Sequence, residues 1–197
     1  MYGMKWSMNN RKVLTKRQKM SFGEYMILAG VGQIEAGAGE LVQQLQKPTK
    51  LCGKPVPVSL DDMSFGNLVR LQGIEQEIDA FFEPCRVLLD VSDKQVAAED
   101  AITVLAFAAW VSREVQRINK LFESTHVDPT IDEIQAGIDK LNFGPFGLVD
   151  YFALRMGIAD HEEVMNIPWI RIFQCMKIDS EKAKFERRLR KVYENKK

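Results

Sequence analysis

The sequence is poor in the side chains on which most catalytic and metal sites depend. Its 197 residues include only three cysteines and two histidines. The cysteines, Cys52, Cys85 and Cys175, stand far apart and form no C-x-x-C pair, which argues against a disulfide framework or a structural zinc site. The histidines, His126 and His161, leave little from which to build a catalytic triad or a multi-histidine metal site. We therefore predict no catalytic residue, no metal and no cofactor.

Long apolar runs are also missing. The longest, from Ala101 to Val111, holds 11 residues and includes Thr103, whereas a membrane-spanning helix needs roughly 20. It is expected to form a buried helix, and no membrane is expected as a partner. The stretch before Met20 is basic, but the glycines and Glu24 that follow make it a poor signal peptide, so we expect a protein that is not secreted.

An excess of charge of one sign is missing as well, because 27 basic side chains balance 27 acidic ones. This balance gives no global signal for a nucleic-acid partner. The distribution is uneven. Residues 1–20 carry six basic and no acidic side chains, and residues 177–197 carry nine basic and four acidic ones. The remaining residues, 21–176, carry 12 basic and 23 acidic side chains. Charged ends are commonly just solvated. Alternatively, the basic ends of one copy lie on the acidic body of the next in a head-to-tail homo-oligomer, as a ring or a filament.

Helical signals dominate the sequence and predict an all-α fold, an irregular bundle of about six to seven helices. Ser21 with Glu24, and Thr130 with Glu133, have the spacing of capping boxes, and Gly157 is suited to a left-handed helix end. The apolar periodicity predicts the following helices: from Asp61 or Asp62 to Phe82, a short one restarted by Pro84, a central one from Ala97 to Phe122, Ile131 to Leu141 ended by the turn at residues 144–147, Leu148 to Met156, a short turn capped by Asp160, and a long terminal one starting at Pro168.

A linker rich in proline and glycine, residues 47–58, interrupts these signals. Its composition allows at most one short edge strand, at Val56 to Leu60. We predict three parts of the chain: a basic N-terminal segment with the Gly/Pro-rich arm (1–58), a central helical core (59–127) and a C-terminal helical subdomain that ends in a basic amphipathic helix (128–197).

The terminal helix is the strongest candidate for binding a partner. Its apolar residues are expected near one face, with basic residues on the other: Ile172, Met176, Ile178, Phe185, Leu189 and Val192. Such a helix can pack on its own body, enter a groove of a partner or lie on an anionic membrane, and the few apolar anchors favour the first two. Together with the basic N-terminal residues, the candidate partner-binding residues are Lys12, Lys16, Arg17, Phe185, Arg187, Arg188 and Leu189.

Two further patterns suggest chemistry but fit it poorly. The glycines from Gly30 to Gly39 lack the spacing of a dinucleotide fingerprint, since Glu35 stands where glycine or alanine is required. The Asp-His-Glu-Glu run at residues 160–163 offers metal ligands, yet adjacent helical side chains point about 100° apart and do not converge. Acids in a first helical turn are explained by capping and the helix dipole, which is the interpretation we favour.

Residues 148–173 have the outline of a helix-turn-helix, with Gly157 in the turn and a short second helix before Pro168. That second helix begins with Asp160, Glu162 and Glu163, which places carboxylates where DNA phosphates would lie. Specific DNA binding is therefore unfavourable and stays an alternative, while the basic ends allow nonspecific contact with nucleic acid.

A series of short motifs lies mainly in the C-terminal third. Its members are Asp132-Glu133-Ile134-Gln135-Ala136-Gly137-Ile138, the Gly144-Pro145-Phe146-Gly147 turn, Asp160-His161-Glu162-Glu163-Val164, Trp169 with Phe173, Lys184-Phe185-Glu186-Arg187-Arg188-Leu189 and, more weakly, Ser21-Phe22-Gly23-Glu24-Tyr25. In these motifs the chain resembles a family of small helical bacteriophage and prophage proteins, the tail assembly chaperones. The stretch from 30 to 58 has no counterpart in that resemblance.

The resemblance implies a non-enzymatic role in virion morphogenesis. Such chaperones coat the long tape-measure protein and recruit tail-tube subunits, and they act in the cytoplasm of the bacterial host. A related alternative is a permanent part of the virion, such as a head-to-tail connector or ring subunit beside the portal. Under both hypotheses the expected partners are other phage structural proteins and further copies of the chain.

Overall fold

The computed structural model describes residues 19–30 and 45–196, and this part of the chain is almost entirely helical. The predicted all-α class is confirmed, with nine α-helices and one two-stranded antiparallel sheet among the described residues. The elements are α1 (Phe22–Gly30), β1 (Lys50–Leu51), β2 (Lys54–Pro55), α3 (Phe65–Gln72), α4 (Asp79–Leu89), α5 (Asp93–Ala98), α6 (Ala101–Glu123), α7 (Ile131–Gln135), the 3-10 helix η2 (Ile138–Lys140), α8 (Gly144–Met156), α9 (His161–Met165) and α10 (Trp169–Glu194).

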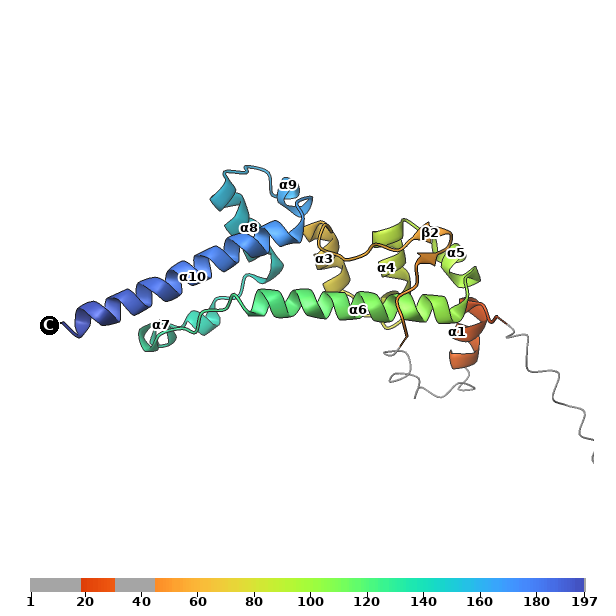
Figure 1. Cartoon of the computed structure of the whole chain (residues 1–197), viewed down its shortest axis with the longest axis horizontal. Helices are drawn as coiled ribbons and strands as arrows, with labels where there is room; N and C mark the ends of the chain where they lie inside the picture. Colours follow the sequence, from red (N-terminus) through yellow and green to blue (C-terminus); the bar gives the residue numbers. More distant parts are fainter. Residues whose placement is uncertain (1–18, 31–44, 197) are drawn as a thin grey trace, which may run out of the picture.

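The 23-residue helix α6 is the central helix of the core. It contacts α1, α3, α4 and β1, and Figure 1 shows it along the long axis of the molecule, with α1, α4, α5 and the hairpin grouped near its N-terminal end. One buried apolar cluster includes residues from Phe22 to Phe173. The division into residues 1–58, 59–127 and 128–197 stays a prediction.

The capping box predicted for α1 is confirmed, and a separate backbone hydrogen bond holds this helix beside the start of α6. The Ser21 N–H donates to the Glu24 carboxylate at 2.9 Å, and the Glu24 N–H donates back to the Ser21 hydroxyl at 3.3 Å. The Phe22 N–H donates to the Glu99 carbonyl at 2.8 Å, and its ring is fully buried against Phe81. α1 is therefore attached to the α5–α6 junction by its backbone and to α4 by the Phe22 side chain.

The helix predicted from Asp61 or Asp62 to Phe82 is wrong in its extent, because the structure has two helices there. Ser64 caps the first, α3, since its hydroxyl accepts from the Asn67 N–H at 3.3 Å. α3 ends at Gly73, and α4 starts six residues later, at Asp79. Hydrophobic periodicity continues across the break, which hides it in the sequence.

Two other predicted boundaries are also wrong. Pro84 restarts no helix, because α4 has already begun and carries Pro84 in its interior. The central helix begins at Ala101 rather than Ala97, since Glu99 has an extended backbone (ψ 162°) and Asp100 caps α6. The additional helices arise from such interruptions, which turn long periodic segments into shorter pieces.

The only strands of the described residues form a hairpin ahead of the predicted edge strand, and Val56 to Leu60 is irregular instead. Cys52 and Gly53 form its turn, with φ values of 49° and 77°. Two successive residues with positive φ are typical of the tight turn that matches strand twist. The Glu99 carboxylate accepts from the Cys52 N–H at 2.7 Å, so it stabilises a turn in which a non-glycine residue is left-handed.

Several C-terminal helix ends agree with the sequence. Gly157 ends α8 in the left-handed region (φ 67°), and the Asp160 carboxylate accepts from the Glu162 N–H at 2.9 Å to cap α9. Pro168 directly precedes α10. Residues 144–147 form the first turn of α8 rather than a separate turn.

The helix expected from Ile131 to Leu141 is shorter than predicted. Its capping box, between Thr130 and Glu133, is present, but α7 covers only Ile131–Gln135. Gly137, with φ 84°, redirects the chain into η2. Neither α7 nor η2 has a buried residue, so this segment adds nothing to the core.

Trp169, the first residue of α10, joins this helix to the segment before α3. Its indole N–H donates to the Leu60 carbonyl at 2.7 Å, and its backbone N–H donates to the Met63 carbonyl at 3.1 Å. Its fully buried ring lies 5.9 Å from the Phe122 ring and 6.2 Å from the Phe173 ring. The N-terminal half of α10 is thereby fixed to the end of α6.

We expect Trp169→Phe to lower the free energy of unfolding by about 1–3 kcal/mol, because the Leu60 carbonyl loses its buried donor. Trp169→Ala also removes the ring and should cost about 3–5 kcal/mol. Urea unfolding followed by far-UV circular dichroism measures both. Trp110→Phe is the matched control, since the Trp110 ring packs beneath the Lys47 ammonium at 4.8 Å and donates no hydrogen bond to the described residues. Equal costs for the two Trp→Phe variants would contradict the role given to the Leu60 contact.

Candidate interaction surface

The apolar residues of α10 occupy two opposite faces, so the single face predicted from the sequence is wrong. Ile172 and Phe173 are buried against the body of the protein, and Met176 packs on the same cluster. Ile178 follows Met176 by two residues, which is about 200° around a helix. Later apolar residues continue on the side of Ile178. The outer face, as we call it, consists of Ile178, Phe185, Leu189 and Val192.

Nothing in the described part of the chain buries the outer face. Ser180 is the last buried residue of α10, and every side chain from residue 181 to 196 is at least partly exposed. Phe185 is 55% exposed and Leu189 36% exposed. Arg188 is exposed and lies between these two residues in the sequence, at the edge of the outer face. Three of the predicted partner-binding residues thus lie together, at or beside an apolar strip.

The opposite side of this part of α10 is attached to α7. The Arg187 guanidinium lies 3.1 Å from the Glu133 carboxylate and also donates to the Asp128 carbonyl. Glu133 accepts from the Thr130 N–H at 2.6 Å as well. Arg187, the remaining predicted partner-binding residue of α10, therefore makes its contacts within the chain.

Asp179 attaches the middle of α10 to α8. Its carboxylate accepts from the Tyr151 hydroxyl and from the Arg155 guanidinium. The Tyr151 hydrogen bond, followed by Arg155, holds the pKa of Asp179 below its usual range, while burial and the Asp179 contact raise the pKa of Tyr151 to about 12. The carboxylate is therefore charged and the phenol protonated at neutral pH, which is the form in which Asp179 accepts both hydrogen bonds.

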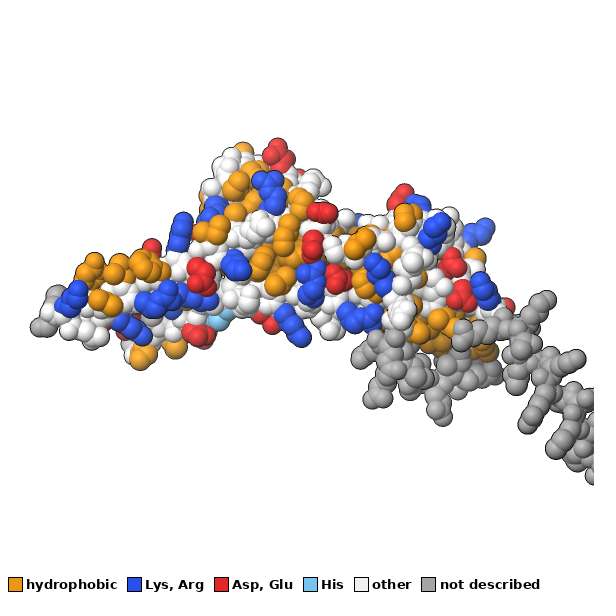
Figure 2. Space-filling view, in the orientation of Figure 1, with side chains coloured by type: hydrophobic (Ala, Val, Ile, Leu, Met, Phe, Trp, Pro, Cys, Tyr) orange, Lys and Arg blue, Asp and Glu red, His pale blue; other side chains and the backbone are white. Residues whose placement is uncertain are grey.

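α7 and η2 carry a second exposed apolar surface. Ile131 is 74% exposed, Ile134 is 55% exposed and Ile138 is also exposed. On α7, Ile131 lies about 200° from Glu133, the residue that contacts α10. We call Ile131, Ile134 and Ile138 the isoleucine ridge. At the left of the view, where the C-terminal part of α10 and α7 lie, Figure 2 shows hydrophobic side chains at the upper and the lower edge, with Lys and Arg side chains between them.

The predicted basic N-terminal residues Lys12, Lys16 and Arg17 lie outside the described residues, as does all of the glycine cluster except Gly30. The described chain begins with Lys19, directly before α1.

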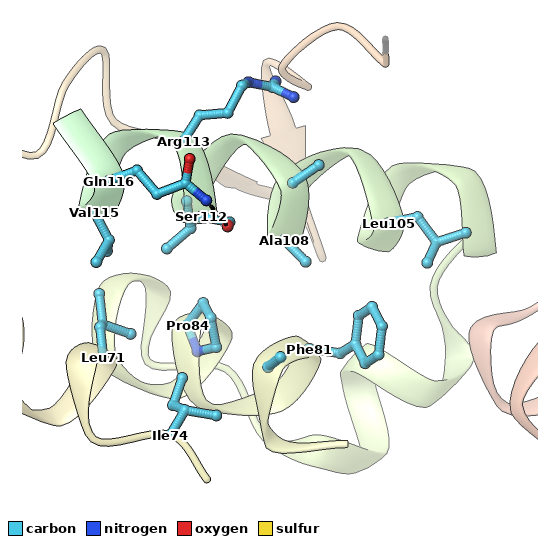
Figure 3. A pocket seen from close by; sticks show the side chains of 13 residues that line it. Leu71, Ile74, Phe81, Pro84, Leu105, Ala108, Ser112, Arg113, Val115 and Gln116 are labelled. Carbon is cyan, nitrogen blue, oxygen red and sulfur yellow. Dashed lines mark hydrogen bonds between the residues drawn. The ribbon is translucent and has the colours of Figure 1, made fainter. Parts of the chain in front are cut away.

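A cavity of about 720 Å³ lies between α6 and the helices α3 and α4. In Figure 3, Leu71, Ile74 and Phe81 line one side, and Leu105 and Ala108 line the other. Its polar lining side chains are Ser112, Arg113 and Gln116, all from α6. None of the 13 lining residues is a carboxylate, histidine or cysteine, so the lining offers the Ser112 hydroxyl no general base of these types.

In the described part of the chain, the two histidines and two of the three cysteines do not gather into a common metal site. His161 lies edge-on to Phe146, with ring centroids 5.0 Å apart, and its Nε2 is 3.6 Å from Asp150. His126 is largely exposed, beside Asp128. Burial raises the pKa of Cys52 to about 11 and that of Cys85 to about 12. These two thiols are therefore protonated at neutral pH and poorly nucleophilic.

Within residues 19–30 and 45–196 no three His, Cys, Asp or Glu side chains gather as a metal site requires. None of the helices in these ranges combines the length and the apolar character needed to cross a membrane. The helix α9, which would be the recognition helix of a helix-turn-helix, spans the five residues His161–Met165 and carries Glu162 and Glu163 in its first turn. A helix this short and acidic is poorly suited to the major groove.

Comparison with known proteins gives no relative: no family model matches the chain, and no curated protein or solved structure is significantly similar to it. The candidate site therefore depends on the residues and their geometry alone.

The isoleucine ridge is the part of the surface that sequence reasoning missed. Helical spacing predicted Ile131, Ile134 and Ile138 as one side of a longer helix, without indicating that they stay exposed. The two faces of α10 have a signal in the sequence, because Met176 and Ile178 are separated by a spacing that no single helical stripe contains. Nothing in the sequence marks Glu133 and Arg187, 54 residues apart, as partners.

Acid should loosen α7 from α10. Hydrogen bonds from the Thr130 backbone and hydroxyl, and then the charge of Arg187, hold the pKa of Glu133 below its ordinary value of 4.5. Because the folded pKa is the lower one, the stabilisation by Glu133 is complete above pH 4.5 and is lost as the pH falls through the lowered value. Amide chemical shifts of α7, recorded by NMR during acid titration, should therefore move toward coil values.

Glu133→Gln is the control for this titration, since the amide keeps an acceptor but does not titrate. In that variant the acid-induced shift of the α7 amides should disappear. The acid-induced shifts of the other amides should be the same as in the unmodified protein. An identical acid transition in Glu133→Gln would assign the effect to another carboxylate.

Proposed function

We propose that the protein is a non-enzymatic assembly protein of a bacteriophage that binds other structural proteins through the outer face of α10. The observation that carries this proposal is the exposed strip of Ile178, Phe185, Leu189 and Val192 on the side of α10 that turns away from the body. A tail assembly chaperone is the member of this class that the sequence motifs favour. Its partner is then the tape-measure or tail-tube protein.

The geometry of the outer face suits a helical partner. From Ile178 to Val192 the face advances by seven, four and three residues, so its side chains stay on one side of the helix. Fourteen residues of α-helix rise about 21 Å, which gives an elongated partner several turns of contact. Apolar anchors at such spacings are how helices dock on one another.

Asp179 and Arg187 give the outer face a defined direction. The former attaches α10 to α8 and the latter attaches it to α7, both from sides other than the outer face. Little ordering of α10 is then needed when a partner binds, and this lowers the entropic cost of the complex. The proposed homo-oligomer and the connector alternative use the same preformed surface.

Substitution of the outer face should abolish capture of the partner. With candidate tape-measure and tail-tube proteins from the same genome as co-expressed baits, Phe185→Glu should weaken the interaction by about 30-fold or more, equivalent to roughly 2 kcal/mol, because the new carboxylate would be buried unpaired. Leu189→Glu should do the same. Co-purification followed by binding titration measures the change.

Leu154→Glu is the matched control. Leu154 is the most exposed leucine of α8, at 76%, and lies outside the outer face, so its variant should bind like the original protein. Equal binding by the Leu154 and Leu189 variants would refute the assignment. Mass spectrometry of purified particles then separates the two phage roles, since a chaperone is absent from mature virions and a connector is present.

A further inference from the structure

The arm formed by residues 181–194 of α10 together with α7 and η2 has an apolar surface on each side. The contact between Arg187 and Glu133 defines which sides of α10 and α7 face each other. Phe185 and Leu189 each lie two residues from Arg187, about 200° away around α10, and Ile131 lies equally far from Glu133 around α7. The outer face of α10 and Ile131, the most exposed residue of the isoleucine ridge, therefore point in opposite directions.

The two surfaces carry opposite charge. Residues 128–140, around the isoleucine ridge, contain four acidic side chains and one basic side chain. Residues 181–196, around the outer face, contain seven basic and three acidic side chains. Asp132 beside the ridge and Arg188 beside the outer face are both exposed. Apolar surfaces edged by opposite charges are complementary to each other.

We infer that the outer face of one copy packs on the isoleucine ridge of a second copy, with Arg188 of the first beside Asp132 of the second. The inference rests on the proposed function in one respect, namely that the outer face is a docking surface. Its occupant here is the isoleucine ridge of a second copy. Because the two surfaces differ, every copy keeps one of each after pairing, and the contact repeats into a ring or a filament.

A symmetric pairing of two outer faces fits the charges less well. It would bring two strongly basic stretches, residues 181–196 of each copy, against each other, and like charges at an interface are repulsive. The isoleucine ridges would also stay exposed in such a dimer. Pairing of the outer face with the ridge covers both apolar surfaces and brings opposite charges together.

Mixing two single variants tests the inference. The unmodified protein should form concentration-dependent assemblies in sedimentation velocity, while Phe185→Glu and Ile131→Glu should each be monomeric. Each variant keeps one intact surface, so the mixture should form a one-to-one heterodimer that does not grow further. Leu189→Glu and Ile134→Glu form a second pair, and circular dichroism verifies that all four variants are folded.

Charge exchange provides an independent readout. Arg188→Glu should weaken the affinity between copies by about tenfold, because one ion pair at a desolvated contact is lost. Asp132→Lys in the copy that supplies the isoleucine ridge should restore this affinity, because it forms an ion pair of reversed sign. High salt should weaken the unmodified assembly in the same direction.

Three outcomes would overturn the stacking. The first is an unmodified protein that stays monomeric up to about 0.1 mM, a concentration at which a contact of micromolar affinity is nearly saturated. The second is a mixture of the two variants that does not associate. The third is self-association of Ile131→Glu with the same affinity as the unmodified protein. If copies fail to stack but Phe185→Glu still abolishes capture of a tail protein, only the stacking is wrong. If copies stack as described but no tail protein is captured, only the proposed function is wrong.

Discussion

The apolar residues of α10 change sides between Met176 and Ile178, and the surface of the molecule is organised by that change. Up to Ser180 the helix buries its inner side against α6 and α8 through Trp169, Phe173 and their neighbours. Beyond Ser180 the inner side is polar and meets α7 through Arg187, while the apolar side chains are on the outside. A helix that continued its first stripe would have covered α7 with its own apolar residues and left no exposed apolar strip on its outer side.

Short local signals were the part of the structure that the sequence predicted well. The capping boxes at Ser21 and Thr130, the left-handed end at Gly157 and the cap at Asp160 each depend on two to four neighbouring residues. The break at Gly73 could not be read, because a gap between α3 and α4 preserves the apolar spacing on both sides. The end of α5 at Glu99 depends on tertiary contacts, since that residue bonds to both α1 and the hairpin.

The candidate site divides in the same way. Phe185 and Leu189 were expected on the same face of the terminal helix as the core residues, with Arg187 and Arg188 on the other face, and partner binding by these four residues stays a prediction. The structure instead exposes Phe185 and Leu189 away from the core and directs Arg187 to Glu133, which is 54 residues away, so that only folding brings the two together. The role of Lys12, Lys16 and Arg17 stays a prediction.

The proposed self-stacking and the proposed capture of a tail protein would use one surface, so the two would compete for it. In an open stack, only the copy at one end would keep a free outer face, and a bound partner would occupy the face that a neighbouring copy needs. The two proposals together therefore imply assembly in the absence of a partner and release of copies in its presence.

Hydroxyl-radical footprinting of Phe185 reports whether the outer face becomes covered when the protein assembles. Oxidation of Phe185 should fall strongly on assembly or partner binding, while oxidation of the exposed Leu154 on α8 should stay the same. Undiminished oxidation of Phe185 in an assembly that demonstrably forms would show that the outer face is not the docking surface.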